Sequence, residues 1–501
     1  MSARLRLPVM LCVCAAVYGA NLHALQIGQH CDDAVYVSVG RSLRAGLGYV
    51  RYEDINHPVE PQYPPALPAL IAATLWASGD RLEALHLIPL AFALAAVVLA
   101  ETFFRRRVPV PGQERGVELW RWLLLGCFGL NHLVVGYAGM VMTEVPFLCL
   151  LLAALVWADR RERTGPALWA AVLALLLGAS CLMRSAGYGL TLGMGLWLWR
   201  ARHRRLAVAT VALTVLLVTP WLVAQKAWTG GWMGAGYQAD MPSAGSTHWP
   251  KVLRPVENLV LYAVHLMPET VLPFLGQEVS QAAARVGAGW LPGALGLLVS
   301  LAILAGAVVY ARRRQDPMNG VFLVMGLVLL VWPWRYTRFF LPLMPVALVY
   351  LLTALHALAP RRSGWLPALA ALAVLGFAVR DVHMALHPPA REYPDVIGRG
   401  RFVDAHVPPE ALVIADNPHM IGPYTHRWLV GAEPLKGYPP ADPDPVKDML
   451  IRSDHGRPRY VLAPLPGRDE PATARVLAQR LPSERVARDD RLGVELWKLK
   501  G

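Results

Sequence analysis

CDDAVYVSVGRSLRAGLGY, residues 31–49, follows directly after the first hydrophobic segment of the chain. Its adjacent carboxylates, Asp32 and Asp33, stand where a membrane helix would emerge into water. The residues after them, up to Gly46, have the apolar spacing of an amphipathic helix. Asp is a favoured N-cap and its charge suits the first helical turn, so capping is one explanation of the pair. The other explanation is a general base at a membrane surface.

The composition indicates a polytopic membrane protein. Of 501 residues, 55% are hydrophobic and only 17% are charged, whereas soluble proteins carry about 25% charged residues. The net charge is +13, but the basic residues lie in short clusters between apolar runs, so membrane topology explains them better than nucleic-acid binding. The six cysteines have neither zinc-site spacing nor the pattern of a disulfide framework.

The apolar runs predict about eleven membrane crossings within a domain of residues 1–385. The first run, Leu7–Ile27, has a basic start, so a cleaved signal peptide is the competing interpretation. The other predicted crossings are Leu82–Phe104, Leu119–Gly136, Val141–Ala158, Pro166–Met183, Gly187–Leu198, Leu206–Ala224, Leu291–Ala311, Val321–Trp332, Phe339–Leu358 and Trp365–Val379.

Basic clusters then set the orientation, because cytoplasmic loops carry an excess of Lys and Arg. With this count, every cluster falls on the side of the N-terminus, which we expect to be cytoplasmic. The clusters are Arg4/Arg6, Arg105–Arg107, Arg160–Arg163, Arg200–Arg205, Arg312–Arg314 and Arg361/Arg362. The predicted location is therefore a bacterial inner membrane, with the loop of residues 28–81, the segment 225–290 and the C-terminal residues on the periplasmic side.

Three external regions are expected to be structured. In the loop 28–81, Asp32–Ala45 has the pattern of an amphipathic helix and Pro64–Ser78 is apolar but too short to cross, and we interpret both as helices in the membrane interface. The segment 225–290, rich in Trp and Pro, is either a folded loop or a lid over a site. Residues 386–501 predict a small soluble α/β domain. Its strands are expected at Ala411–Ala415, Arg459–Ala463 and Val494–Leu499, and its helices at Asp444–Ile451 and Ala472–Leu481.

Several motifs together resemble one family of enzymes. They are DDAVY (32–36), GLGY (46–49), QYPPALPALIAA (62–73), MTEVPFLCLLLAAL (142–155), LLLGASCLMRSAG (175–187) and RYTRFFLPLMP (335–345). In their order, and in the side on which they fall, they resemble the GT-C glycosyltransferases that use polyprenyl-phosphate sugars. The protein O-mannosyltransferases of glycosyltransferase family 39 and the lipid A aminoarabinose transferases are similar in pattern. The resemblance covers roughly residues 1–380.

The resemblance implies roles for individual residues. Asp32 matches the family's catalytic aspartate, Asp33 the adjacent acidic position and Tyr36 an aromatic residue beside it. Glu144 matches the second acidic position of the pocket, although a carboxylate in the first turn of a helix is also explained by the helix dipole. His86 is a departure from the pattern, because family members often carry Arg there, and a phosphate-holding role at that position would fall to another residue.

Further candidates come from their positions at external helix ends and in the first loop. Arg184 and Arg338 are either interfacial arginines or clamps for a donor phosphate, since guanidinium groups bind a leaving phosphate through charge-assisted hydrogen bonds. Arg335 is a weaker candidate for the same task. His57 and Tyr63 are candidates for contacts with sugar or phosphate, against the simpler explanation of solvated loop side chains.

These features favour an inverting glycosyltransferase. Its donor would be a polyprenyl-phosphate sugar, and its acceptor a hydroxyl on a lipid, glycan or protein. A transporter or flippase of a lipid-linked substrate is the alternative, although transporters place polar residues near the bilayer midplane. A non-catalytic assembly partner is a third possibility. No cofactor is certain, and a divalent cation is left open because Asp32, Asp33 and Glu144 suit either chemistry. The sugar, the acceptor and the oligomeric state do not follow from the sequence.

Overall fold

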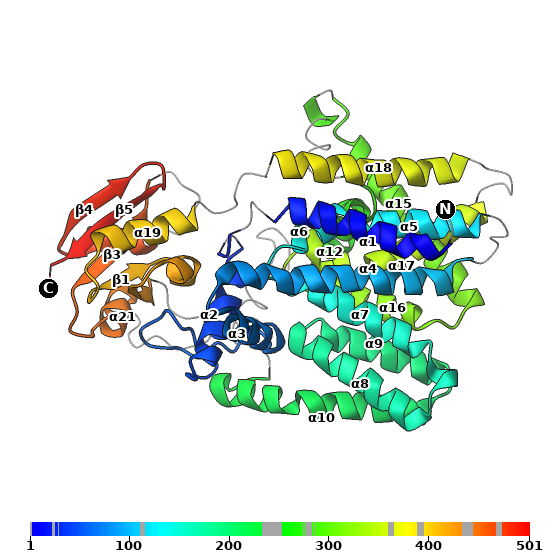
Figure 1. Ribbon diagram of the computed structural model, residues 1–501, viewed down its shortest axis with the longest axis horizontal. Coiled ribbons are helices and arrows are strands. Elements are labelled where there is room, and N and C mark those ends of the chain that lie inside the picture. The colour runs from blue at the N-terminus through cyan, green and yellow to red at the C-terminus, as the bar shows by residue number, and fades with distance from the viewer. Residues whose placement is uncertain are drawn as a thin grey trace.

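The computed structural model describes most of the chain. Described are residues 3–22, 26–28, 30–110, 116–232, 253–273, 275, 283–285, 287–358, 365–387, 395–432, 444–466 and 473–500. Within these ranges the protein has a bundle of long helices and, at one end of it, a domain built on a β-sheet (Figure 1).

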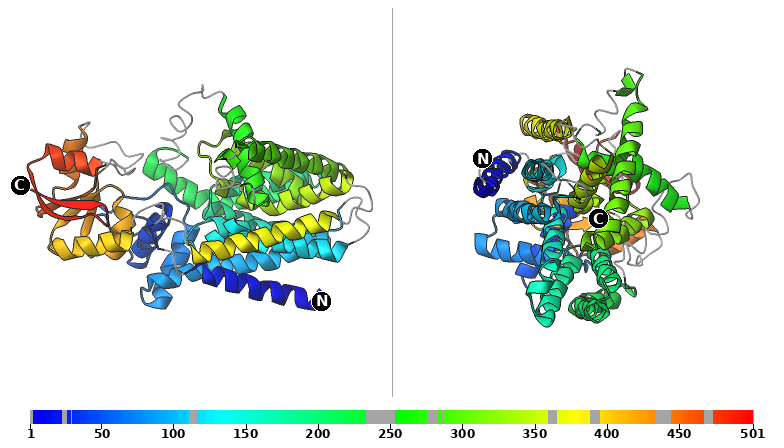
Figure 2. Two further views of the ribbon diagram at one scale, coloured as in Figure 1. Left: turned by 90° about the horizontal axis from the view of Figure 1, so that it is seen from above. Right: turned by 90° about the vertical axis from the view of Figure 1, so that its right-hand side faces the viewer.

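The bundle follows the hydrophobic runs of the sequence. Its helices are α1 (Ala3–Ala20), α4 (Leu87–Arg107), α5 (Val117–Gly129), α6 (His132–Tyr137), α7 (Glu144–Ala158), α8 (Pro166–Met183), α9 (Gly187–Arg200), α10 (Arg204–Thr229), α15 (Leu291–Arg313), α16 (Pro317–Val331), α17 (Met344–Leu358) and α18 (Trp365–Leu386). Seen along the helices, α1 and α18 lie at the periphery (Figure 2). Among the described residues, six helical segments are long and apolar enough to cross a membrane, and four further apolar helices are shorter. The protein is an integral membrane protein, and the figure of eleven crossings stays a prediction.

One predicted crossing differs in form. The run Leu119–Gly136 is divided into α5 and α6, because Leu130 and Asn131 leave the helical path between them. The Asn131 side chain then accepts a hydrogen bond from the backbone N–H of Leu133 at 3.0 Å and caps α6. A second polar contact, from Asn131 to the carbonyl of Thr270 at 2.7 Å, fixes the break against α13 (Met267–Val271).

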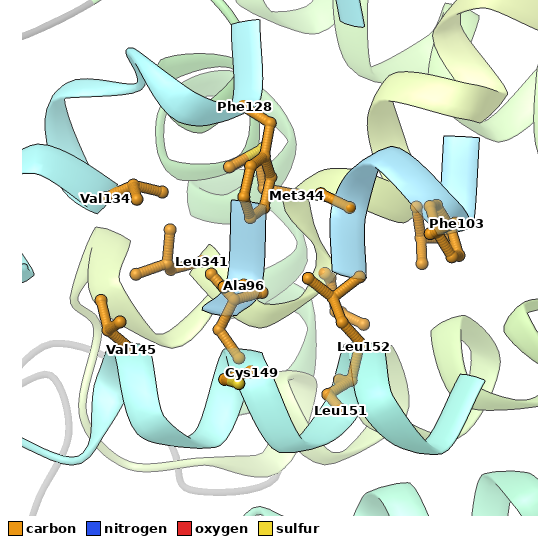
Figure 3. Packing of buried hydrophobic residues seen from close by; sticks show 14 of the residues in the cluster. Ala96, Phe103, Phe128, Val134, Val145, Cys149, Leu151, Leu152, Leu341 and Met344 are labelled. Carbon is orange, nitrogen blue, oxygen red and sulfur yellow. The ribbon is translucent and has the colours of Figure 1, made fainter. Parts of the chain in front are cut away.

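The hydrophobic core lies between the central helices. Figure 3 shows Phe103 of α4, Phe128 of α5, Leu152 of α7 and Met344 at the start of α17 among the side chains of one buried cluster. Each of these four side chains is buried. A fully buried side chain of this size contributes about 1.5–3 kcal/mol relative to an exposed one, so this packing holds α7 in place. The first residue of α7 is Glu144, one of the candidate acidic residues.

Two of the predicted basic clusters, Arg105–Arg107 and Arg312–Arg314, meet at one end of the bundle, away from the sheet domain. Arg107, at the end of α4, donates hydrogen bonds to Asp159 after α7 at 3.1 Å and to Asp316 before α16 at 2.9 Å. Arg314 donates to the carbonyl of Arg107 at 3.3 Å. Clusters far apart in sequence therefore share one end, as the orientation argument requires.

The first predicted external loop occupies the other end. It contains α2 (Asp32–Arg44) and α3 (Ala66–Ser78), which lie between the bundle and the sheet domain (Figure 1). Gly40 of α2 leaves no room for a Cβ against Ile71 and the carbonyl of Pro68, so the two helices approach closely. Both were predicted as helices, and their place in a membrane interface stays a prediction.

The segment 225–290 returns to the bundle. Residues 233–252 lie outside the described part, so the lid hypothesis falls mainly on them. After them come α12 (Arg254–Leu261), a π-helical turn η4 (Tyr262–Leu266) and α13. Asn258 of α12 donates to the carbonyls of Leu330 at 2.9 Å and Trp332 at 2.8 Å, so this segment supports the end of α16.

The C-terminal residues form the predicted α/β domain with a five-stranded sheet of order β2-β1-β3-β5-β4. β2, β1 and β3 are parallel, and β5 runs antiparallel to both β3 and β4. The strands are β1 (Leu412–Ala415), β2 (Trp428–Gly431), β3 (Arg459–Pro464), β4 (Ser483–Asp489) and β5 (Val494–Leu499). The helices are α19 (Val396–His406), α20 (Pro418–Ile421), α21 (Pro445–Arg452) and α22 (Thr473–Arg480).

The helices cover both faces of this sheet. Val403 of α19 packs in one buried cluster with Val413 of β1, whereas Leu477 of α22 packs in another with Ile414. β1, β3 and β5 and the helices α21 and α22 were predicted. β2 and β4 were not, because β2 has only four residues and β4 is a charged edge strand.

The first loop is joined to this domain. The backbone N–H of Ile55 donates to the carbonyl of Leu429 at 3.0 Å, and the N–H of Leu429 donates to the carbonyl of Glu53 at 3.1 Å. Arg41 of α2 reaches the carbonyl of Pro423 at 3.4 Å. These contacts hold the sheet domain against α2 and the loop that follows it.

Candidate active site

A cavity of about 430 Å³ lies where the bundle, the first loop and the sheet domain meet. α2 and the loop after it form one side, and the starts of α7 and α9 with the end of α16 form another. The sheet domain contributes Asn417, Pro418, His419, Gly431 and Arg452. The predicted residues Asp32, Tyr36, Tyr63, Glu144, Arg184 and Arg338 all line this cavity.

Asp32 is the first residue of α2, and its carboxylate faces the cavity. Its Oδ1 accepts a hydrogen bond from the Tyr63 hydroxyl at 2.6 Å, and its Oδ2 accepts one from Arg338 at 3.2 Å. The side chain keeps 27% of its surface exposed. Because each carboxylate oxygen has two lone pairs, both oxygens retain acceptor capacity toward the cavity.

Asp33 does not line the cavity. Its carboxylate accepts backbone hydrogen bonds from Gly28 at 2.7 Å, His30 at 3.3 Å and Ala34 at 2.9 Å. Burial raises the pKa of the Asp33 carboxyl, and the N–H of Gly28 opposes that shift. Asp33 therefore holds the turn that leads into α2, and the structure separates the two neighbouring acids that the sequence could not separate.

Glu144 is buried at the start of α7 and faces two arginines. Its Oε1 lies 2.7 Å from Nη1 of Arg184 and 3.6 Å from Nε of Arg338. Among the described residues, neither Glu144 oxygen accepts a well-aligned hydrogen bond, so these are charge contacts. Arg184 instead donates to the Thr143 hydroxyl at 3.0 Å. Arg338 thus stands between Asp32 and Glu144, with Arg184 on the far side of Glu144.

Aromatic rings hold these groups in place. Tyr36 and Tyr63 meet edge to face with ring centroids 4.8 Å apart. The guanidinium groups of Arg184 and Arg338 lie 5.3 Å and 5.5 Å from the centre of the Phe339 ring. Burial raises the pKa of the Tyr63 hydroxyl well above its usual value, which keeps this phenol a hydrogen-bond donor to Asp32.

Besides Asp33, three further predicted residues do not line the cavity. Arg335 forms a bidentate ion pair with Glu257 at 2.7 and 2.8 Å, so its charge is already neutralised. His86 contacts the carbonyl of Gly139 through Nδ1 at 2.6 Å. His57 contacts the carbonyl of Arg51 at 3.2 Å, and its ring lies against Trp428 of the sheet domain.

Sequence reasoning missed the contribution of the sheet domain. His419 and Arg452 line the cavity, but neither lies in a motif, and both are remote in sequence from Asp32. Cys31 begins the stretch of residues 31–49, but no role was predicted for it. A weak signal was available at Asn417-Pro418, a dipeptide that favours a turn directly after the predicted strand at 411–415.

Comparisons with known proteins place the fold. No protein-family model matches the sequence, and no curated protein is significantly similar to it in sequence. Solved structures are similar. ArnT from Cupriavidus metallidurans bound to undecaprenyl phosphate superimposes with a TM-score of 0.62 at 14% identity, covering 99% of this chain and 98% of that one. The apo state of that protein gives a TM-score of 0.61 at 14% identity, over 98% and 97% of the two chains.

The oligosaccharyltransferase of Archaeoglobus fulgidus, in complex with Zn and sulfate, gives a TM-score of 0.55 at 13% identity over 91% of this chain and 68% of that one. The fold is that of the GT-C glycosyltransferases. The likeness to ArnT extends over the sheet domain as well as the bundle, since it covers nearly the whole of both chains.

The arrangement in this GT-C fold does not fit a divalent cation. Across the described residues, no three His, Cys, Asp or Glu side chains converge on one point. Asp32 and Glu144, the two acids on either side of Arg338, are in contact with guanidinium groups instead. The steps proposed below therefore use only the residues of this chain.

Proposed function

We propose that this protein is an inverting glycosyltransferase that moves a sugar from a polyprenyl-phosphate donor to a hydroxyl acceptor on the external face of a membrane. The observation that carries the proposal is the row Asp32, Arg338, Glu144 and Arg184 along one cavity wall, with contacts of 3.2, 3.6 and 2.7 Å. It places a partly exposed carboxylate beside the guanidinium group of Arg338, with that of Arg184 further along the same wall, as sugar transfer from a phosphate requires.

The arginines suit the leaving group. As the bond between the anomeric carbon and the phosphate oxygen breaks, the phosphate gains negative charge, and fixed cations stabilise that charge in the transition state. Arg184 and Arg338 are 18% and 19% exposed and face the cavity. Buried Glu144 holds both in place and offsets part of their charge, so the empty site is not a pair of unopposed cations.

Asp32 suits the attacking group. An acceptor hydroxyl that enters on the side of α2 can give its proton to a carboxylate oxygen of Asp32 while its own oxygen bonds to the anomeric carbon. The polyprenyl phosphate then leaves with the electron pair of the broken bond. Attack from the side opposite the phosphate inverts the anomeric configuration, and no covalent intermediate with the protein is formed.

The apolar wall suits a lipid donor. Met325, Val328 and Leu329 of α16 line the cavity, and Leu323, Leu327 and Val331 of the same helix are exposed apolar residues. An isoprenoid chain lying along α16 would keep its phosphate near the arginines. ArnT, which has this fold, was solved with undecaprenyl phosphate, and the archaeal oligosaccharyltransferase AglB with dolichol phosphate and an inhibitory peptide.

The test is sugar release and transfer from radiolabelled polyprenyl-phosphate sugars by purified protein and by Asp32→Asn. Loss of a general base lowers kcat by about 10²–10⁴-fold. Asp404→Asn is the matched control, because Asp404 is also partly exposed at 25% and arginine-paired but lies outside the cavity. Full transfer by folded Asp32→Asn would remove Asp32 from the mechanism. Binding or translocation of the lipids without turnover by the wild type would favour the transporter alternative.

A further inference from the structure

One short segment of the sheet domain, residues 417–424, contacts the turn before Asp32 at several points. The backbone N–H of Ile27 donates to the Tyr424 hydroxyl at 3.0 Å. Gly28 has φ +96°, and a Cβ there would lie 2.7 Å from the carbonyl oxygen of Met420. The Sγ of Cys31, the residue that precedes Asp32, lies 3.0 Å from Nε2 of His419.

The backbone of both segments is strained where the turn before Asp32 meets residues 417–424. Cys31 has φ 59° and Asn417 has φ 36°, a region that residues other than glycine rarely adopt. The described part of the chain contains five such residues, and Cys31, Asn417 and His57 all lie where the first loop meets the sheet domain. Strained backbone persists only where surrounding contacts hold it, and it gathers at functional sites. Here the strain immediately precedes the proposed base.

The contact between Cys31 and His419 is a hydrogen bond between neutral groups. Burial raises the pKa of the Cys31 thiol to about 12, and Asp32 adds to that shift. Burial lowers the pKa of His419 to about 3, and Arg51 adds to that shift. Whichever atom donates, neither group carries charge near neutral pH, so the contact positions the backbone without competing with the arginines for a phosphate.

We propose that His419 is a positioning residue, which acts through Cys31 to hold the first turn of α2 so that the Asp32 carboxylate faces the cavity. The inference rests on the proposed function, because it assigns the sheet domain a role in placing the base. His419 is only 7% exposed, which agrees with a place between the sheet domain and the turn before Asp32.

The contact itself is tested first, by a measurement that needs no activity. Maleimide labelling of Cys31, followed by peptide mass spectrometry, should be about tenfold faster in His419→Ala, the factor expected for the loss of one hydrogen bond. His419→Gln, whose amide can occupy the place of Nε2, should restore slow labelling. His426→Ala is the control, since that histidine is 89% exposed in the same domain. Equal labelling rates in wild type and His419→Ala would overturn the inference.

The consequence is tested by kinetics. His419→Ala should lower kcat by about 10–100-fold, the effect of misplacing a reacting group by about 1 Å, with the donor KM unchanged and His419→Gln recovering most of the rate. Cys31→Ala should lose a similar factor, and the double variant no more than either single one. The inference would be overturned if the loss of kcat in the double variant equalled the product of the two single losses. An unchanged kcat in His419→Ala, or a fall that His419→Gln does not rescue, would overturn it too. If Cys31 of the wild-type protein is labelled slowly but the protein transfers no sugar, the proposed function is overturned instead.

Discussion

The two ends of the helical bundle each carry an arginine between two carboxylates, but the two clusters differ in how completely they are satisfied. At the end away from the sheet domain, Arg107 is 1% exposed and donates aligned hydrogen bonds to Asp159 and Asp316. At the cavity end, Arg338 is 19% exposed and lies 3.2 Å from Asp32 and 3.6 Å from Glu144.

This difference shows what separates a structural ion cluster from a binding site. Arg107 directs its guanidinium at carboxylates that belong to the protein, and Phe103 covers it at 4.2 Å. Arg338 has looser contacts and faces a cavity, so its N–H groups can turn to a ligand. The same residue types thus hold the fold together at one end and are available for chemistry at the other. Each prediction below tests that distinction.

The largest effect on stability is expected at the closed cluster. Arg107→Gln removes a buried cation from the partly buried carboxylates of Asp159 and Asp316, and breaking a buried pair costs about 3–5 kcal/mol. Denaturation of the detergent-solubilised protein should show this loss, while the folded fraction keeps its kcat. Arg488→Gln is the control, because its pair with Asp490 is exposed and contributes about 0–1 kcal/mol. A large fall in kcat without a loss of stability would mean that the two ends are not distinct.

The open cluster should show the opposite pattern. Removing one group that stabilises transition-state charge costs about 10²–10³-fold in kcat, so Arg338→Gln should lose that factor and little stability. Arg338→Lys should recover part of the rate, since an ammonium group keeps the charge but not the planar fork. Steady-state transfer assays and thermal melting on the same preparations give both numbers. If Arg338→Gln unfolds as readily as Arg107→Gln, the cavity cluster is structural as well.

The two neighbouring aspartates provide a finer comparison within the cavity end. Asp33→Asn keeps one carbonyl acceptor but loses the charge that strengthens three backbone hydrogen bonds, so it should cost about 2 kcal/mol of stability. Its kcat should fall much less than that of Asp32→Asn, because Asp33 does not line the cavity. Urea titrations and transfer assays of the two variants decide this. A greater loss of kcat in Asp33→Asn than in Asp32→Asn would make Asp33 the base.

The sequence predicted what depends on local pattern. The bundle followed from apolar runs, α2 from its periodicity, α3 from an apolar stretch too short to cross, and the placement of Arg184 and Arg338 at the cavity end from the alternation of basic clusters. Those inferences need only helix geometry and the energetics of burial in lipid.

What the sequence does not show depends on partners that are distant in sequence. Arg335 was the weaker candidate for a phosphate clamp, and the structure pairs it with Glu257, 78 residues away. Adjacent residues on a helix point about 100° apart, which shows that Asp32 and Asp33 diverge but not which one faces the cavity. The contact of Cys31 with His419 spans 388 residues, and no local pattern encodes it.

The smallest expected effect concerns this last contact and follows from pH. The folded protein keeps His419 neutral, with a pKa of about 3, whereas an unfolded histidine titrates at about 6.5. Below pH 6.5 the unfolded chain therefore binds a proton that the folded protein does not, so this stabilisation is complete above pH 6.5 and is lost as pH falls toward 3. The groups beside the imidazole are the neutral thiol of Cys31 and the cation of Arg51, which disfavours a second positive charge.

At pH 5.5 the loss amounts to about 1.4 kcal/mol relative to pH 7.5, one pKa unit of linkage. Unfolding of wild type and His419→Gln at both pH values isolates this contribution, because every other titrating group is common to the two proteins. His419→Gln should lose less stability on acidification than the wild type. If both lose the same amount, His419 accepts a proton in the folded protein as readily as in the unfolded chain, and the contact with Cys31 does not keep the imidazole neutral.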